Sequence, residues 1–178
     1  YGTDGVKADY KLRLKRAGLN AAFFLLVPGP KMIWQFGEIG YDYSITYNGD
    51  RTAKKPWVTD DYLKDADRKA LYDTYSMLLK FRADNPRFFD GDAQFRWGVG
   101  ASNNPGRYIF CTNGDGDTFA LFGNFGTGEQ TVKITLPSDA TWYRYDDSSS
   151  EWKGSYHEPK MSEGQFYILV DDKSLCKK

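Results

Sequence analysis

The first candidate for chemistry is Glu38, which follows the bulky run Met32–Phe36 and Gly37 directly. If that run is a strand of a βα barrel, Glu38 stands at the end where such barrels gather active-site groups. The alternative is a carboxylate that caps or ion-pairs with the following loop. Residues 38–64 form a long connection that contains Tyr and Gly, and loops of this length in compact domains usually carry function. Within it, Asn48-Gly49-Asp50 is typical first of a turn and only second of a ligand site.

Other polar clusters favour structural roles. Asn113–Asp117 resembles a calcium loop superficially, but the closing Glu of the twelve-residue pattern is absent at that spacing. The stretch lies between two candidate strands, so we expect a hairpin turn. One histidine, His157, and two cysteines, Cys111 and Cys176, exclude a His-cluster zinc site, a zinc ribbon and a disulfide framework. We therefore expect no metal and no cofactor.

Aromatic residues in the second half of the chain allow two interpretations. They could stack on sugar rings at a glycan-binding surface, or they could fill the core between sheets. Because aromatic residues are favoured in strands for packing, we favour the core. The residues concerned are Trp97, Trp142, Tyr143, Tyr145 and Trp152.

Composition excludes two kinds of partner. The chain has 24 basic and 24 acidic side chains, so it lacks the positive excess of a nucleic-acid-binding protein. The longest apolar run, Ala21–Val27, is far shorter than the ~20 residues that span a bilayer. The balance hides an asymmetry, since residues 1–82 carry 14 basic and 10 acidic side chains and residues 83–178 carry 10 and 14. The change near Pro86 suggests a domain boundary.

Residues 1–85 have the pattern of helix, strand, long loop and helix. Apolar spacings of three, four and seven predict a helix from about Lys7 to Leu26, which Pro28-Gly29-Pro30 ends. Met32–Phe36 is predicted to be a strand in the centre of a sheet. A second helix is predicted to begin near Asp65 and Asp67, whose carboxylates suit the helix dipole, and to end before Pro86.

Residues 86–178 show a period of two, with turn residues between short apolar segments. This pattern predicts an antiparallel sandwich or Greek-key barrel. The fold class expected for the whole chain is therefore α+β, with residues 1–85 and 86–178 as two units. The candidate strands are Phe95–Val99, Arg107–Thr112, Thr118–Asn124, Gln130–Leu136, Thr141–Asp146, a ragged one near Trp152, and Gln165–Val170.

Several of these segments together resemble the α-amylase family of glycoside hydrolases (family 13). Leu25–Gly29, Met32-Ile33 and Gly37–Gly40 resemble the eighth-strand segment of that family. Pro56-Trp57 and the helix that follows resemble the last barrel helix of that family and the exit from it. The residues of this chain that carry this similarity are Arg68, Leu71, Tyr75, Leu78, Leu79, Arg82, Asn85-Pro86 and Gly91. The end of the chain, Gly164–Leu169, resembles the family's C-terminal sandwich, domain C. Trp34-Gln35-Phe36 replaces the usual aromatic pair, which leaves hydrolysing, branching and debranching members open.

This resemblance implies the last helix–strand–helix elements of a (β/α)8 barrel followed by a Greek-key domain C. It implies a parent enzyme that cleaves α-1,4-glucans such as starch, glycogen or maltooligosaccharides with retention. The family's catalytic carboxylates would lie upstream of Tyr1, so this segment is expected to be inactive alone and to contain no catalytic residue. Its implied contribution is substrate binding by Glu38, Asp50, Arg51 and Lys54. The resemblance is compatible with secretion or periplasmic export, but these residues give no cellular address.

Two other functions stay open. The chain could be a carbohydrate-binding module with a helical appendage, or a purely structural domain. A separate expectation concerns Met32–Phe36, because a lone barrel strand exposes unpaired backbone groups on both edges. We expect this segment to pair with a neighbouring chain, giving self-association, or to pack in some other way.

Overall fold

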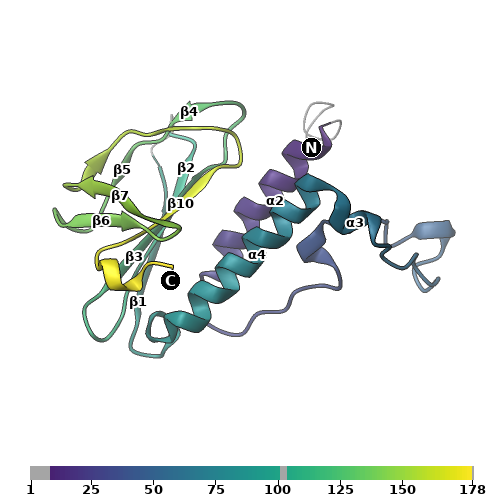
Figure 1. Cartoon of the computed structure of the whole chain (residues 1–178), viewed down its shortest axis with the longest axis horizontal. Helices are drawn as coiled ribbons and strands as arrows, with labels where there is room; N and C mark the ends of the chain where they lie inside the picture. Colours follow the sequence, from purple (N-terminus) through teal and green to yellow (C-terminus); the bar gives the residue numbers. More distant parts are fainter. Residues whose placement is uncertain (1–8, 101–103, 178) are drawn as a thin grey trace.

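The computed structural model describes residues 9–100 and 104–177, which form two long helices beside an antiparallel sheet (Figure 1). Helix α2 (Tyr10–Leu25) begins where the Asp9 side chain accepts a hydrogen bond from Leu12 N at 3.0 Å. Helix α4 (Ala66–Asp84) begins in the same manner, with Asp65 accepting from Asp67 N and Arg68 N. Both predicted helices are therefore confirmed, although Lys7 lies outside the described residues.

The connection between these helices contains only short helical turns. They are the 3₁₀ turns η1 (Gly37–Ile39) and η2 (Tyr47–Gly49) and the four-residue helix α3 (Asp61–Lys64). Two further 3₁₀ turns, η3 (Pro86–Phe89) and η4 (Lys173–Leu175), follow α4 and the last strand. No helix in the part of the chain that the structure describes is long and apolar enough to cross a membrane.

The prediction of a central strand at Met32–Phe36 is wrong. Within residues 9–100 and 104–177 no strand pairs with this segment, and the Met32 and Trp34 side chains are 74% and 73% exposed. A strand needs an adjacent strand to accept and donate its backbone hydrogen bonds, and a run of apolar residues does not by itself provide that partner. The segment ends in a turn, where Phe36 has a φ of 61° and Gly37 N donates to Trp34 O. Its pairing with another chain stays a prediction.

After α4, the chain forms a six-stranded antiparallel sheet in the order β1-β2-β3-β10-β6-β7. Its strands lie close to the predicted ranges, since turn residues and alternation mark them well. They are β1 (Gln94–Val99), β2 (Gly106–Thr112), β3 (Thr118–Asn124), β6 (Thr141–Arg144), β7 (Asp147–Lys153) and β10 (Phe166–Val170).

Two short sheets lie beside this large one. They pair β4 (Gln130–Thr131) with β9 (Lys160–Met161) and β5 (Ile134–Thr135) with β8 (Tyr156–His157). The single strand predicted over Gln130–Leu136 is thus divided into β4 and β5, which keep the same antiparallel register. Between them the Val132 N–H still donates to Pro159 O, but proline has no N–H to donate in return. The fold class is mixed helix and antiparallel sheet, an arrangement compatible with α+β and a β-sandwich.

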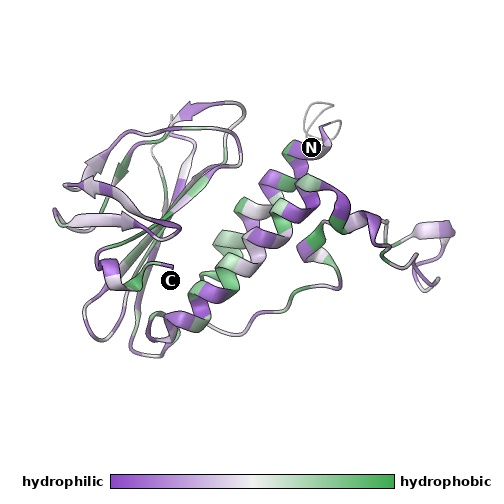
Figure 2. Ribbon diagram, viewed as in Figure 1, coloured by the Kyte–Doolittle hydropathy of each residue, from purple (hydrophilic) through white to green (hydrophobic). Residues whose placement is uncertain are grey.

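The large sheet is covered on both faces, as its alternating side chains show. On one face Ile109, Phe119 and Leu121 pack against Leu78 and Phe81 of α4 and their neighbours on α2. On the other face Phe110, Phe122 and Trp142 pack with residues of the short sheets. Strand β3, in the middle, is buried along its whole length. Figure 2 shows hydrophobic residues where the helices face the sheet, so one continuous core joins helices and sheet.

Candidate ligand-binding cleft

The connection between α2 and α4 encloses a cleft of about 540 Å³. Aromatic and positively charged side chains dominate its walls, and Trp34 and Trp57 are both more than 70% exposed. These two rings can therefore offer a face to a ligand. The lining residues are Trp34, Gln35, Phe36, Gly37, Tyr41, Tyr43, Ser44, Ile45, Arg51, Ala53, Lys54, Lys55, Pro56 and Trp57.

Residues 39–42 lie among the lining residues Gly37, Tyr41 and Tyr43 and are called the base of the cleft; Arg68 fixes them to helix α4. Its buried guanidinium donates to the carbonyl oxygens of Ile39, at 3.0 Å, and Gly40. It also donates to Asp42 Oδ2 at 3.2 Å and lies 4.0 Å from the centre of the Tyr62 ring. A planar guanidinium can hold several acceptors in fixed directions, so η1 and the following residues have a defined position on the helix.

Gly40 allows the connection to approach helices α2 and α4 closely. Its φ of 65° is in the left-handed region, and a Cβ at this position would overlap the Leu14 side chain of α2. Only glycine meets both conditions without strain. The connection is thereby held against both helices.

The opposite wall is closed by contacts within the connection. Tyr41 Oη donates to Pro56 O at 2.6 Å, and the Phe36 and Trp57 rings meet edge to face at 5.2 Å. Lys55 Nζ donates to backbone carbonyl groups, including Ala53 O at 3.0 Å. Aromatic contacts of this kind hold Trp57 beside the cleft without burying it.

Of the four predicted binding residues, Arg51 and Lys54 line the cleft and Glu38 and Asp50 do not. Asp50 Oδ1 accepts from Thr52 N and Thr52 Oγ1, both at 2.8 Å, and these hydrogen bonds lower the pKa of Asp50. The carboxylate thus stabilises its own turn. Glu38 lies on η1 near Tyr75 of α4, whose pKa is raised by burial and then by the Glu38 charge.

The aromatic walls of the cleft are not among the features predicted from the sequence. Tyr41 and Tyr43 belong to the long connection 38–64 and Trp57 to the Pro56-Trp57 motif, and no binding role is predicted for any of them. The available signal was the concentration of aromatic residues in a connection where no strand or helix requires them for packing.

The remaining candidates have structural roles. Asn113–Asp117 forms the predicted hairpin turn between β2 and β3, in which Asn113 Oδ1 accepts from Asp115 N and Asp117 N. Among the described residues, no group of three or more His, Cys, Asp or Glu side chains could hold a metal ion. The Nε2 atom of His157 lies 2.9 Å from Gly154 O, within hydrogen-bond distance of the backbone of its own turn.

The aromatic residues of the sheet divide between core and surface. Trp142 and Tyr145 are fully buried, as the core interpretation requires, and Trp97 on edge strand β1 is 70% exposed. Trp97 lies on a second, apolar groove of about 350 Å³ beside α2. The core interpretation is therefore wrong for Trp97, which offers a face to solvent, whereas Tyr143 and Trp152 are partly buried.

Neither a protein-family model nor a curated protein matches this chain. Its function therefore has to be argued from the cleft and from the elements that carry it.

Proposed function

We propose that this chain is the C-terminal part of an α-amylase-like glycoside hydrolase of family 13, which cleaves α-1,4-glucans with retention. In this proposal α2, the irregular segment 28–36 and α4 are the last elements of a (β/α)8 barrel, and the sheet is the Greek-key domain C. The cleft of residues 34–57 binds the glucan beside a catalytic centre that other parts of the protein supply.

The direction of the helices carries this proposal. At their beginnings, Lys11 of α2 is ion-paired with Asp67 of α4 at 3.5 Å. At their ends, Arg82 of α4 donates to Leu25 O and Val27 O. The helices are therefore parallel, and the connection returns beside them to η1 at their beginnings (Figure 1). A connection that returns between two parallel helices is also found in a barrel repeat.

Exposed apolar side chains support the same interpretation. Phe24, Met32, Ile33 and Leu79 all belong to the helices or the returning segment, and each is more than a third exposed. Large apolar patches on a protein surface indicate an interaction site. In a complete barrel, neighbouring strands and helices would cover such side chains.

The residues of this chain would bind and orient the sugar. Exposed rings of Trp34 and Trp57 can stack on the apolar faces of glucosyl units, and Arg51 and Lys54 can donate charged hydrogen bonds to hydroxyl groups. Retaining cleavage itself needs two carboxyl groups about 5–5.5 Å apart, one as nucleophile and one as acid. In the proposal neither comes from the cleft of this chain.

The test is a hydrolysis assay on the reading frame that encodes this chain, expressed with any residues encoded before Tyr1. Maltoheptaose is the substrate, and proton NMR records the anomeric configuration of the first product. We expect products in the α configuration from that protein and no hydrolysis by the 178-residue chain alone. Inverted products, or hydrolysis by the chain alone, would contradict the proposal.

The exposure of Trp97 favours a second candidate, a carbohydrate-binding module that acts through the sheet. The two functions are distinguished by titrating maltoheptaose into Trp57→Ala and Trp97→Ala, which remove equally exposed rings from different sites. Loss of binding only in Trp57→Ala supports the cleft. Loss only in Trp97→Ala supports the module.

A further inference from the structure

We infer that the cleft of residues 34–57 selects α-glucans that carry an anionic group on a sugar ring over neutral α-glucans. The inference rests on the proposed function and specifies its ligand. The anionic group is a phosphate monoester or a carboxylate, which share the chemistry that the cleft recognises.

The charge of the cleft wall carries the inference. Three charged side chains line the cleft, and all are cations: Arg51, Lys54 and Lys55. Among the described residues, no hydrogen bond or ion pair occupies the Arg51 guanidinium or the Lys54 ammonium group, and both residues are exposed. Their donors are therefore available to a ligand without breaking a contact of the protein.

Lys55 differs, since backbone carbonyl groups already hold its ammonium group. Its Nζ donates to Asp50 O and Ala53 O, each at 3.0 Å. Carbonyl oxygens keep this ammonium in place without neutralising it. Its charge adds to the positive potential of the wall while Arg51 and Lys54 make the contacts.

Among the described residues, no acidic side chain lines the cleft, and the Asp50 carboxylate acts on Lys55, so the charge open to a ligand is that of Arg51 and Lys54. Asp50 accepts hydrogen bonds from Thr52. Asp42 is ion-paired with Arg68 at 3.2 Å and accepts from Tyr62 Oη at 3.0 Å. Since neither aspartate lines the cleft, a neutral ligand would leave its cations without a partner.

The combination of rings and cations defines the ligand. A phosphate or carboxylate matches the fork of an arginine, and a lysine adds a point charge. The exposed rings of Trp34 and Trp57 suit the apolar face of a sugar. An anion attached to a stacked sugar ring satisfies both features, whereas free phosphate satisfies only one.

The experiment compares ligands by calorimetric titration into the 178-residue chain at low salt. The probes are maltoheptaose, maltoheptaose phosphorylated at O6 of one glucosyl unit, a maltooligosaccharide that ends in glucuronic acid, and inorganic phosphate. We expect the phosphorylated chain to bind about tenfold tighter than maltoheptaose, because charge-assisted hydrogen bonds are stronger than neutral ones. The glucuronate probe shows which anion is preferred. Salt should reduce the difference between charged and neutral probes.

Variants assign the effect to the cleft. Arg51→Gln and Lys54→Gln should each weaken binding of the phosphorylated chain several-fold more than binding of maltoheptaose, so that most of the preference is lost. Arg96→Gln is the matched control, because Arg96 is an exposed arginine on β1 that does not line the cleft. It should preserve the preference.

Three outcomes would overturn the inference. Equal affinity for neutral and phosphorylated maltoheptaose rejects it and leaves the proposed function standing. Inorganic phosphate binding as tightly as the phosphorylated chain indicates an adventitious anion site. Absence of binding by every oligosaccharide rejects glucan binding at the cleft, whereas the proposed hydrolase activity is decided separately by the anomeric assay.

Discussion

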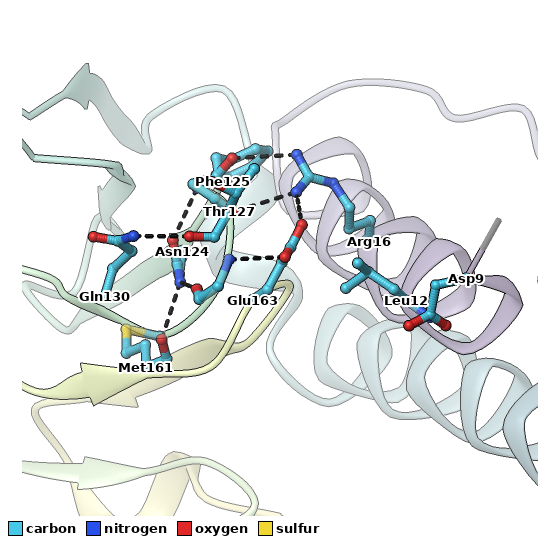
Figure 3. Close-up of polar contacts among 11 residues, drawn as sticks. Asp9, Leu12, Arg16, Asn124, Phe125, Thr127, Gln130, Met161 and Glu163 are labelled. Carbon is cyan, nitrogen blue, oxygen red and sulfur yellow. Dashed lines mark hydrogen bonds and ion pairs between the residues drawn. The ribbon is translucent and has the colours of Figure 1, made fainter. Parts of the chain in front are cut away.

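Arg16 of helix α2 and Glu163 of the turn before β10 form an ion pair across 147 positions of sequence (Figure 3). The same guanidinium donates to Phe125 O and Gly126 O, both at 3.2 Å. Glu163 Oε2 in turn accepts from Gly128 N at 2.8 Å. One pair of side chains thus joins the helices to two loops of the sheet, at the edge of the shared apolar core.

Glu163→Gln should destabilise the chain by about 1–2 kcal/mol, because the charge is lost while an oxygen remains for Gly128 N. The side chain of Glu163 is only 12% exposed, so solvent screens the pair weakly. Urea denaturation measures the loss. Asp73→Asn is the control, since it breaks the exposed Lys69–Asp73 pair and should cost at most about 0.5 kcal/mol. Equal losses in the two variants would show that Arg16–Glu163 is an ordinary surface pair.

Gly40→Ala should destabilise the chain and weaken ligand binding in the cleft. Alanine would have to adopt a φ of 65° and its Cβ would overlap Leu14, so we expect a loss of about 2–4 kcal/mol. Gly49→Ala separates the two causes, because Gly49 has a φ of 75° and open space around it. It should cost about 1 kcal/mol. Thermal denaturation compares the two, and an equal loss would exclude the contact with Leu14 as a cause.

The sequence was sufficient for elements that local contacts define. Helix α4 begins directly after Asp65 because that side chain caps it, and β3 is apolar over Phe119–Phe122 because both faces of the sheet are covered. The segment Met32–Phe36 could not be placed in this way, since a strand depends on a partner that its own residues do not specify. The cleft could not be predicted either. Its walls depend on contacts such as Phe36 with Trp57 and on Arg68, whose acceptors lie 26 to 29 positions away.

Tyr145→Phe should stabilise the chain by about 1 kcal/mol. The Tyr145 hydroxyl is buried and, within residues 9–100 and 104–177, has no hydrogen-bond partner, so removing it ends a desolvation cost. The ring remains edge to face with Phe81 at 4.8 Å. Tyr41→Phe is the opposite case, because its hydroxyl donates to Pro56 O, and it should destabilise by about 1 kcal/mol. Chemical denaturation measures the free energy of unfolding of both variants. A lower stability of Tyr145→Phe would mean that a water molecule forms a hydrogen bond with the hydroxyl group.

The same tyrosine gives a prediction for alkaline pH. Burial, followed by the negative charges of Asp84 and Cys176, raises the pKa of Tyr145 from 10.0 to about 12. The folded chain therefore holds this proton more tightly than the unfolded chain does, and the resulting stability is complete below pH 10. It is lost as the pH rises from 10 to about 12. Melting temperatures across this range should fall less steeply in Tyr145→Phe than in the unaltered chain. Identical slopes would show that the pKa of Tyr145 is the same in the folded and the unfolded chain.

Arg68→Lys should weaken glucan binding although Arg68 lies outside the cleft. A lysine cannot hold the carbonyl groups of Ile39 and Gly40 together with Asp42, so the base of the cleft should loosen. We expect a loss of about 2 kcal/mol in stability and about tenfold in maltoheptaose affinity.

Arg82→Lys is the matched control for this change, because Arg82 also donates to backbone carbonyl groups of the connection, but at its other end. It should lose comparable stability and keep its affinity. Amide hydrogen exchange should report faster exchange near Gly40 only in Arg68→Lys. If both variants lose affinity equally, binding depends on the stability of the whole connection and not on the position that Arg68 gives to the base of the cleft.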